Sequence, residues 1–311
     1  ASAPKGFASF AKAMPIWLRE KLFQKKLIMN YLKTHDKNFK DESKILFSEH
    51  HLSHAASAFY PSPFEKAIVL TADGVGEWAT TTVAIGASEK LEIKKELHFP
   101  HSLGLLYSAF TYYTGFKVNS GEYKLMGLAP YGKPKYTEEI LNHLIDLKDD
   151  GTFILDQKYF NYSTGLTMTN EKFDNLFGNP PRKPEKEKIT QFHMDIAASI
   201  QKVTEKIMLM LARSLKAEYK LPNLCLAGGV ALNCVANGKI LEEKIFENIW
   251  VQPAAGDAGG SLGAALAYWH IDLKKERKNI SEDNMQGSYL GNYFQDEEIK
   301  KTLNEIGAEF I

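Results

Sequence analysis

Three of the nine histidines fall within five positions, in the stretch "SEHHLSHAASAFYPSP". A helix from about His50 to Phe59 would stack residues i and i+4 on one face, so His50 and His54 could aim ring nitrogens at one point. That is the geometry of a metal-binding pair. His51 points about a quarter-turn away from His50, which suits a packed ring or a hydrogen-bond donor behind the ligands. His51 with His54 stays open as a second pairing. A single histidine would more often be a hydrogen-bonded core residue, and the clustering favours the metal interpretation.

Two aspartates could complete such a site. Asp73 follows an apolar run in "LTADGVGE", and Asp257 lies in the glycine-rich stretch "AAGDAGGS". Each has a simpler explanation, an Asx turn that closes a hairpin for Asp73 and a helix N-cap for Asp257. If both converge with His50 and His54, two imidazoles and two carboxylates would suit Fe, Mn or Zn, whereas Mg or Ca would not require imidazole. Such a metal could act as a Lewis acid on a carbonyl or phosphoryl oxygen.

The elements that must position these side chains follow from periodicity and turn residues. We expect a short strand in "SKILFSEHH" that leads into the histidine helix, and a hairpin in "EKAIVLTADGVGEWATTTVAIGA" that turns at residues 73–76. Apolar residues nearly all round "SLGLLYSAFTYYTG" predict a buried helix. Amphipathic helices are predicted for residues 14–33 and 189–220.

Two similar units occur towards the end of the chain, "NLCLAGGVALNCVANGKIL" and "NIWVQPAAGDAGGSLGAALAYWH". Each predicts a short strand, a glycine-rich loop and a helix, an arrangement whose backbone N–H groups and helix dipole can hold phosphate. The alternative is that the glycines serve tight turns and close packing of helix on strand. The predicted nucleotide contacts in these loops are Gly228, Gly229, Asn233, Gly256, Gly259 and Gly260.

Composition narrows the possible partners and setting. Lys plus Arg and Asp plus Glu both number 38, so no global basic field favours nucleic acid or an anionic membrane. The two cysteines, Cys225 and Cys234, make no disulfide framework and suit a reducing cytoplasm. No apolar run approaches the roughly 20 residues that span a bilayer, and the first residues show no signal-peptide pattern. We expect a cytoplasmic protein.

Several stretches occur in the order typical of one enzyme family. The chain resembles the O-carbamoyltransferases that modify nodulation factors, cephalosporins and aminoglycosides. The resemblance runs from about residue 45 to residue 295. Its motifs are "EHHLSHAASAFYPSPF", "VLTADGVGEWATTT", "PHSLGLLYSAFTYYTGF", "GEYKLMGLAPYG", "AGGVALNCVANGKI" and "VQPAAGDAGGSLGAAL".

The resemblance implies an α/β catalytic domain of the actin/Hsp70/sugar-kinase-like (duplicated ribonuclease H-like) fold, akin to the enzyme that places threonylcarbamoyl on tRNA. It implies that His50, His54, Asp73 and Asp257 hold iron, and that the "GGVALN" loop holds the adenylate. Lys124, in "GEYK", would contact the carbamoyl donor or acceptor. The simpler interpretation of that stretch is a surface loop with an exposed charge pair. Lys124 and His54 are thus the expected catalytic residues.

In this family a second domain joins carbamoyl phosphate to ATP, and the domain seen here then transfers carbamoyl from carbamoyladenylate to a hydroxyl. Members begin with a strand hairpin that would precede residue 1, and the second domain would follow near residue 290. We therefore expect residues 1–285 to form an N-terminally incomplete catalytic domain and residues 286–311 to lead into a synthase-like domain. Such a fragment would hold metal and preformed adenylate without running the whole cycle.

The sequence is also compatible with other functions. A non-haem iron oxygenase would use two histidines and one carboxylate, but its small β-barrel does not match alternating strands, glycine loops and helices. A tRNA threonylcarbamoyl transferase would share the fold, although zero net charge disfavours a tRNA surface. A non-catalytic nucleotide or sugar sensor is a third possibility. The acceptor, the general base and the oligomeric state carry no signal in the sequence.

Overall fold

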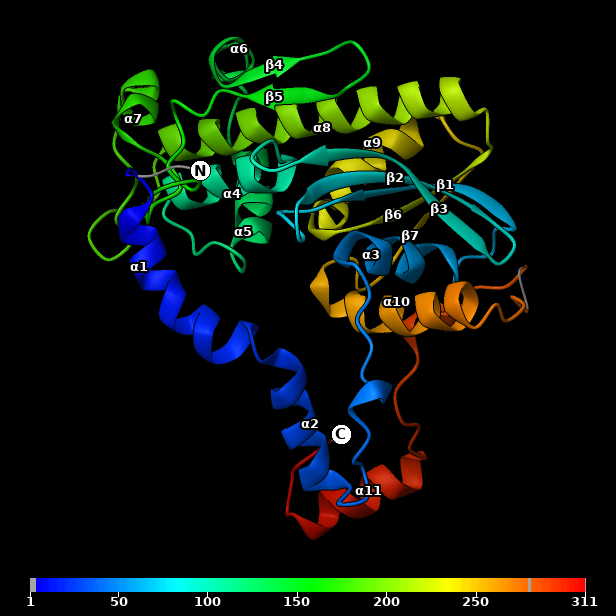
Figure 1. Ribbon diagram of the computed structural model, residues 1–311. Helices are drawn as coiled ribbons and strands as arrows, with labels where there is room; N and C mark the ends of the chain where they lie inside the picture. Colours follow the sequence, from blue (N-terminus) through cyan, green and yellow to red (C-terminus); the bar gives the residue numbers. More distant parts are fainter. Residues whose placement is uncertain (1–3, 279–280, 311) are drawn as a thin grey trace.

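The computed structural model describes residues 4–278 and 281–310 (Figure 1). The strands are β1 (Lys66–Ala72), β2 (Ala79–Ala87), β3 (Lys90–His98), β4 (Ile145–Leu147), β5 (Phe153–Leu155), β6 (Asn223–Ala227) and β7 (Asn248–Val251). The α-helices are α1 (Phe7–Ile16), α2 (Gln24–His35), α3 (His50–Phe59), α4 (Leu103–Tyr113), α5 (Glu122–Leu128), α6 (Thr137–Glu139), α7 (Glu171–Phe177), α8 (Gln191–Tyr219), α9 (Cys234–Glu242), α10 (Gly260–Ala267) and α11 (Asp296–Glu305).

Five strands form one mixed sheet in the order β3-β2-β1-β6-β7. β1 pairs antiparallel with β2, and β2 pairs antiparallel with β3. On its other edge β1 pairs parallel with β6, which pairs parallel with β7. The predicted hairpin and both strand, loop and helix units are therefore confirmed, as is the α/β class. The sheet brings the turn after β1 next to the loops after β6 and β7, although some 150 residues separate them.

Helices cover both faces of this sheet (Figure 1). Alternate residues of β1 point to opposite sides, because side chains along a strand have a period of two. Ile68 and Leu70 pack into the core that α4 and α8 share. Ala67 and Val69 pack against residues of α3 on the other side. All four side chains are fully or almost fully buried, and burying an Ile, Val or Leu contributes about 1.5–3 kcal/mol.

The long helix predicted for residues 189–220 is confirmed as α8, which spans 29 residues. A capping box between Thr190 and His193 begins it, and Lys220 ends it in the left-handed conformation. Most of its predicted apolar face is buried, namely Ile196, Ile200, Val203, Ile207 and Leu211. At the start of the predicted face, Phe192 is only partly buried, and Ile189 is exposed and precedes α8. The buried helix predicted before residue 115 is likewise confirmed as α4.

The beginning of the chain differs from the expectations in two places. The helix predicted over residues 14–33 forms but is not regular throughout. α1 contains Pro15 and ends at Ile16, a π-helical turn follows (Trp17–Lys21), and residues 22–23 form a turn before α2 begins. The strand predicted in residues 43–51 does not form. Of the apolar residues in this segment, Ile45 is buried, whereas Leu46 and Phe47 are exposed. No strand of the sheet pairs with this segment, and α1 and α2 extend away from the sheet (Figure 1).

In sequence between β3 and β6, the chain includes a segment with little regular structure. Residues 145–190 contain the two-stranded ribbon β4–β5 and the short helix α7, with irregular segments between them. Among the described residues, none of the helices has the length and apolar character needed to cross a membrane.

Candidate metal centre

The predicted histidine helix is confirmed as α3, whose first residue is His50. The Nε2 atoms of His50 and His54 lie 3.0 Å apart, and their ring centroids are separated by 4.6 Å. The side chain of His54 is 1% exposed, whereas that of His50 is 28% exposed. One turn of helix therefore aims both ring nitrogens at the same point, one from the core and one from its edge.

Asp73 meets the two histidines from the end of β1. Its Oδ2 lies 2.9 Å from Nε2 of His50 and 3.3 Å from Nε2 of His54. Its Oδ1 accepts a hydrogen bond of 3.0 Å from the backbone N–H of Gly229. Ser102, the N-cap of α4, donates its hydroxyl to the carbonyl oxygen of Asp73 at 2.9 Å. The carboxylate thus joins the histidine helix to the loop after β6, which a local Asx turn would not do.

Asp257 completes the cluster from the loop that precedes α10. Its Oδ1 lies 3.4 Å from Nε2 of His50 and 3.6 Å from Nε2 of His54, and its side chain is 79% exposed. The side chain caps no helix, since Gly259 occupies the N-cap position of α10. α10 crosses α3 so closely that a Cβ atom on Gly263 would overlap the carbonyl oxygen of Ser53. Close packing of these helices therefore delivers Asp257 to the histidines.

The four side chains fit one transition-metal ion. Each offers one ligand atom, and all four atoms lie within 4.8 Å of one another. Metal–ligand bonds of about 2.0–2.2 Å place neighbouring ligands roughly 3.0–3.5 Å apart, which is close to the distances found here. Two imidazoles with two carboxylates suit Fe, Mn or Zn. Four protein ligands would also leave positions open to a substrate if the ion were octahedral.

The members of the cluster shift each other's pKa values. Burial alone would raise the pKa of Asp73, but hydrogen bonds from His50 and His54 outweigh it and hold that pKa well below its usual range. The hydrogen bond with Asp73 raises the pKa of His50 in turn. A divalent cation could bind the four converging atoms at once, and its charge would compensate the two carboxylates.

His51 lies outside the cluster. Its ring is buried, and Nδ1 contacts the Thr71 hydroxyl at 2.7 Å, which in turn contacts the Thr82 hydroxyl at 2.7 Å. Burial, together with the two neighbouring histidines, lowers the pKa of His51 to about 4, so the ring is neutral near pH 7. Of the two predicted roles for His51, a packed ring or a hydrogen-bond donor behind the ligands, the structure has the packed ring. The alternative metal-binding pair of His51 with His54 does not form.

The first glycine loop lies directly beside the cluster. Gly228 has a φ of +88°, which favours glycine, and a Cβ there would overlap the carbonyl oxygen of Ala72. The Asn233 side chain is buried, where it caps α9 through the Ala236 N–H at 3.0 Å and pairs with the Gln201 amide. The close approach of the Ala72 backbone explains why residue 228 is a glycine, and the side chain of Asn233 is occupied in capping α9.

The second glycine loop and Lys124 are placed differently. A Cβ on Gly259 would overlap the carbonyl oxygen of Ala254, whereas Gly260 faces open space and Gly256 has only the Leu232 side chain nearby. Lys124 is exposed on α5, with its ammonium 5.8 Å from the centroid of the neighbouring Tyr123 ring. The structure does not bring Lys124 into the four-residue cluster.

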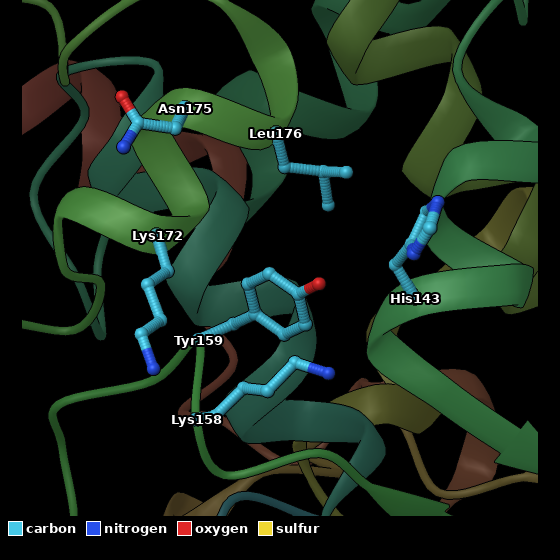
Figure 2. A pocket seen from close by; sticks show the side chains of 6 residues that line it. All are labelled: His143, Lys158, Tyr159, Lys172, Asn175 and Leu176. Carbon is cyan, nitrogen blue, oxygen red and sulfur yellow. The ribbon is translucent and has the colours of Figure 1, made fainter.

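A cavity of about 340 Å³ lies elsewhere, beside α7 (Figure 2). Its lining residues are His143, Lys158, Tyr159, Lys172, Asn175 and Leu176. Lys158 already forms an ion pair of 2.6 Å with Asp156. None of the predicted site residues lines this cavity, so it is separate from the histidine–aspartate cluster.

The mixed sheet and the cluster at its strand ends define an α/β protein with a candidate transition-metal centre. Residues 1–266 match the family model described as "Carbamoyltransferase N-terminus". The chain therefore belongs to this carbamoyltransferase family, which confirms the resemblance.

Relatives are longer than this chain. It is 62% identical to "Uncharacterized protein sll1178" of Synechocystis sp., an alignment that covers 100% of this chain and 51% of that protein. It is 39% identical to "Nodulation protein NolNO" of Sinorhizobium fredii, over 76% of this chain and 35% of the relative. "Nodulation protein NolO" of Bradyrhizobium diazoefficiens is 35% identical, over 78% and 45%. The chain thus spans about half the length, or less, of these relatives.

Among solved structures, "Crystal structure of T.kodakarensis HypF" is similar over 81% of this chain and 40% of that chain, with a TM-score of 0.40 and 16% sequence identity.

Proposed function

We propose that this chain transfers a carbamoyl group from carbamoyladenylate to a hydroxyl of a sugar-containing or other small-molecule acceptor. Membership of the carbamoyltransferase family supports group transfer. The observation that carries the proposal is the convergence of His50, His54, Asp73 and Asp257 on one point beside a glycine loop. Such a point can hold a cation next to a phosphate-bearing leaving group.

We propose Fe²⁺, or another divalent transition metal, as the resident ion. When bound, it would supply Lewis acidity to the carbamoyl carbonyl. His50 and His54 would bind it through Nε2, and Asp73 through Oδ2, while Oδ1 of Asp73 keeps its bond to Gly229. This shared carboxylate would couple the position of the loop to that of the ion. The exposed Asp257 would close the side of the site that faces solvent.

The adenylate is proposed to lie along the two glycine loops. The proposed contacts are Gly228, Gly229, Asn233, Gly256, Gly259 and Gly260. Support comes from the open space at Gly256 and Gly260, and from the helix start that Asn233 organises. In the transfer step, the acceptor oxygen forms a bond to the carbamoyl carbon and the bond from that carbon to the phosphate oxygen of AMP breaks. The acceptor proton leaves to a base. Lys124 and His54 remain the proposed catalytic residues.

We further propose that residues 1–285 form the catalytic domain of an actin/Hsp70/sugar-kinase-like fold, and that residues 286–311 lead into a synthase-like domain in longer proteins. Three antiparallel strands followed by two parallel ones, in the order β3-β2-β1-β6-β7, support a ribonuclease H-like unit. The described residues contain one such sheet. Positions 1–3, 279–280 and 311 of these proposed domains lie outside the described residues. Carbamoyl phosphate and ATP are the proposed partners from which the second domain would make carbamoyladenylate, and the proposed setting is the cytoplasm.

A direct transfer assay tests the proposal. The chain would be incubated with preformed carbamoyladenylate, Fe²⁺ and a panel of aminoglycoside, cephalosporin and lipo-oligosaccharide acceptors, and products would be analysed by mass spectrometry. We expect a metal-dependent gain of one carbamoyl group on at least one acceptor, and its loss in His54→Ala. Metal-independent product, or transfer unaffected by that substitution, would contradict the proposed role of the cluster.

A further inference from the structure

The helix that carries both imidazoles has no capping side chain of its own. α3 begins at His50, and the preceding residue, Glu49, makes no side-chain capping hydrogen bond. The first N–H groups of a helix have no partner inside it and need acceptors from elsewhere. Here the acceptor is Glu77, from the turn between β1 and β2. Its two carboxylate oxygens lie 3.0 and 3.1 Å from the backbone nitrogen of His50.

The same turn holds His50 at two places. Asp73, four residues before Glu77, contacts the ring nitrogen of His50 at 2.9 Å, while Glu77 accepts from its main chain. The turn is fixed by backbone hydrogen bonds, among them Gly76 N–H to the carbonyl of Ala79 at 2.9 Å. It lies so close to α3 that a Cβ on Gly76 would come within 3.0 Å of Cβ of His50. One turn therefore contacts both the main chain and the side chain of His50.

We propose that Glu77 is a positioning residue that anchors the first turn of α3 and thereby sets the affinity of the cluster for its metal. Glu77 is not among the four converging ligands. Its bond acts on the first helical residue, where fraying would move the Nε2 atom of His50 away from Asp73 and Asp257. This inference rests on the proposed metal centre. Residues that orient metal ligands commonly change metal affinity by 10-fold to 100-fold when they are removed. Because Glu77 is exposed, we expect the lower end of that range.

Calorimetric titration of the metal-free chain with Co²⁺, which gives the Kd of the cluster, tests the proposal. Glu77→Ala should raise the Kd about 10-fold, and Glu77→Gln, which keeps one acceptor oxygen, should raise it about threefold. The matched control is Glu49→Gln, which removes the same charge at the same helix end but no capping bond. We expect its Kd to stay within about twofold of the unsubstituted chain. A Glu49→Gln effect as large as that of Glu77→Ala would assign the effect to charge alone and overturn the proposal.

Hydrogen exchange gives an independent readout. In the metal-free chain, the His50 amide should exchange about 10-fold faster in Glu77→Ala than in Glu49→Gln, because only the former loses its acceptor. If the unsubstituted chain binds Co²⁺ and Glu77→Ala binds it equally well, the role of Glu77 is refuted while the metal centre stands. If the unsubstituted chain binds no Co²⁺, the metal centre itself is refuted, and this inference with it.

Discussion

The strongest stability prediction concerns Arg277, which holds the far end of the histidine helix. Its buried guanidinium donates from Nε to the carbonyl of Tyr60 at 3.0 Å, from Nη1 to that of Phe64 at 2.6 Å, and from Nη2 to that of Phe59 at 2.8 Å. Nη2 also donates to the carbonyl of Ser62. The guanidinium lies 4.4 Å from the centroid of the Phe59 ring. A positive charge at the C-terminal end of a helix also complements its dipole.

Arg277→Met keeps most of the side-chain stem and removes all of these interactions. Each buried carbonyl left without a donor is destabilising by about 1–3 kcal/mol. The loss is partly offset, because burial of the guanidinium is itself unfavourable, as its lowered pKa indicates. We therefore expect a net loss of about 3–5 kcal/mol in the free energy of unfolding, as when one partner of a buried charged network is removed. At roughly 2 °C per kcal/mol for a chain of this size, Tm should fall by about 6–10 °C.

Urea denaturation followed by circular dichroism, with calorimetry for Tm, measures this effect. Arg277→Lys should be intermediate, because it keeps the charge and loses the fork of donors. The control is Lys278→Met, whose exposed side chain should change stability by less than about 0.5 kcal/mol. A loss below about 1 kcal/mol in Arg277→Met would refute the idea that this residue secures α3.

Two further predictions follow from close contacts. Gly263→Ala should lower the free energy of unfolding by about 1–3 kcal/mol in urea titrations, because its methyl group would overlap the carbonyl of Ser53. An unchanged urea midpoint would show that the two helices can separate freely. Burial opposes ionisation of Asp195, but the Lys135 ammonium and the Lys133 N–H outweigh it and lower the pKa of Asp195 to about 2. Since the folded-state pKa is depressed, this contribution is present above about pH 4 and is lost as pH falls towards 2. Asp195→Asn should therefore lose up to about 2 kcal/mol at pH 6 and little at pH 2, and an equal loss at both values would contradict this account.

The histidine pair could be predicted from the sequence because its geometry is local. Helical periodicity alone places His50 above His54, and the structure has that helix. Asp73 and Asp257 are different. Judged by their neighbours alone, an Asx turn and an N-cap are the simpler interpretations. The residue types make a shared metal site with the histidines a hypothesis, and the family resemblance implies it. Their convergence depends on strand order, which brings the ends of β1, β6 and β7 together.

The long-range capping contacts of α3 could not be predicted from the sequence. Glu77 caps a helix 27 positions earlier, and Arg277 caps the same helix from more than 200 positions later. Nothing in the local sequence of either residue marks such a distant contact. Leu46 and Phe47 show the reverse case. These apolar residues predict a strand, but both are exposed and no strand of either sheet pairs with them. The glycine loops predict phosphate contacts, but at Gly228 and Gly259 close packing also requires glycine.

The central claim is that His50, His54, Asp73 and Asp257 bind one divalent transition metal. Anaerobic titration of the metal-free chain with Fe²⁺, with bound metal counted by elemental analysis, tests it most directly. We expect one ion per chain. Binding should fall to near zero in His54→Ala, because the imidazole that this substitution removes is the most buried of the four side chains. Binding of no ion, or of one ion that persists in His54→Ala and in Asp73→Asn alike, would contradict the account.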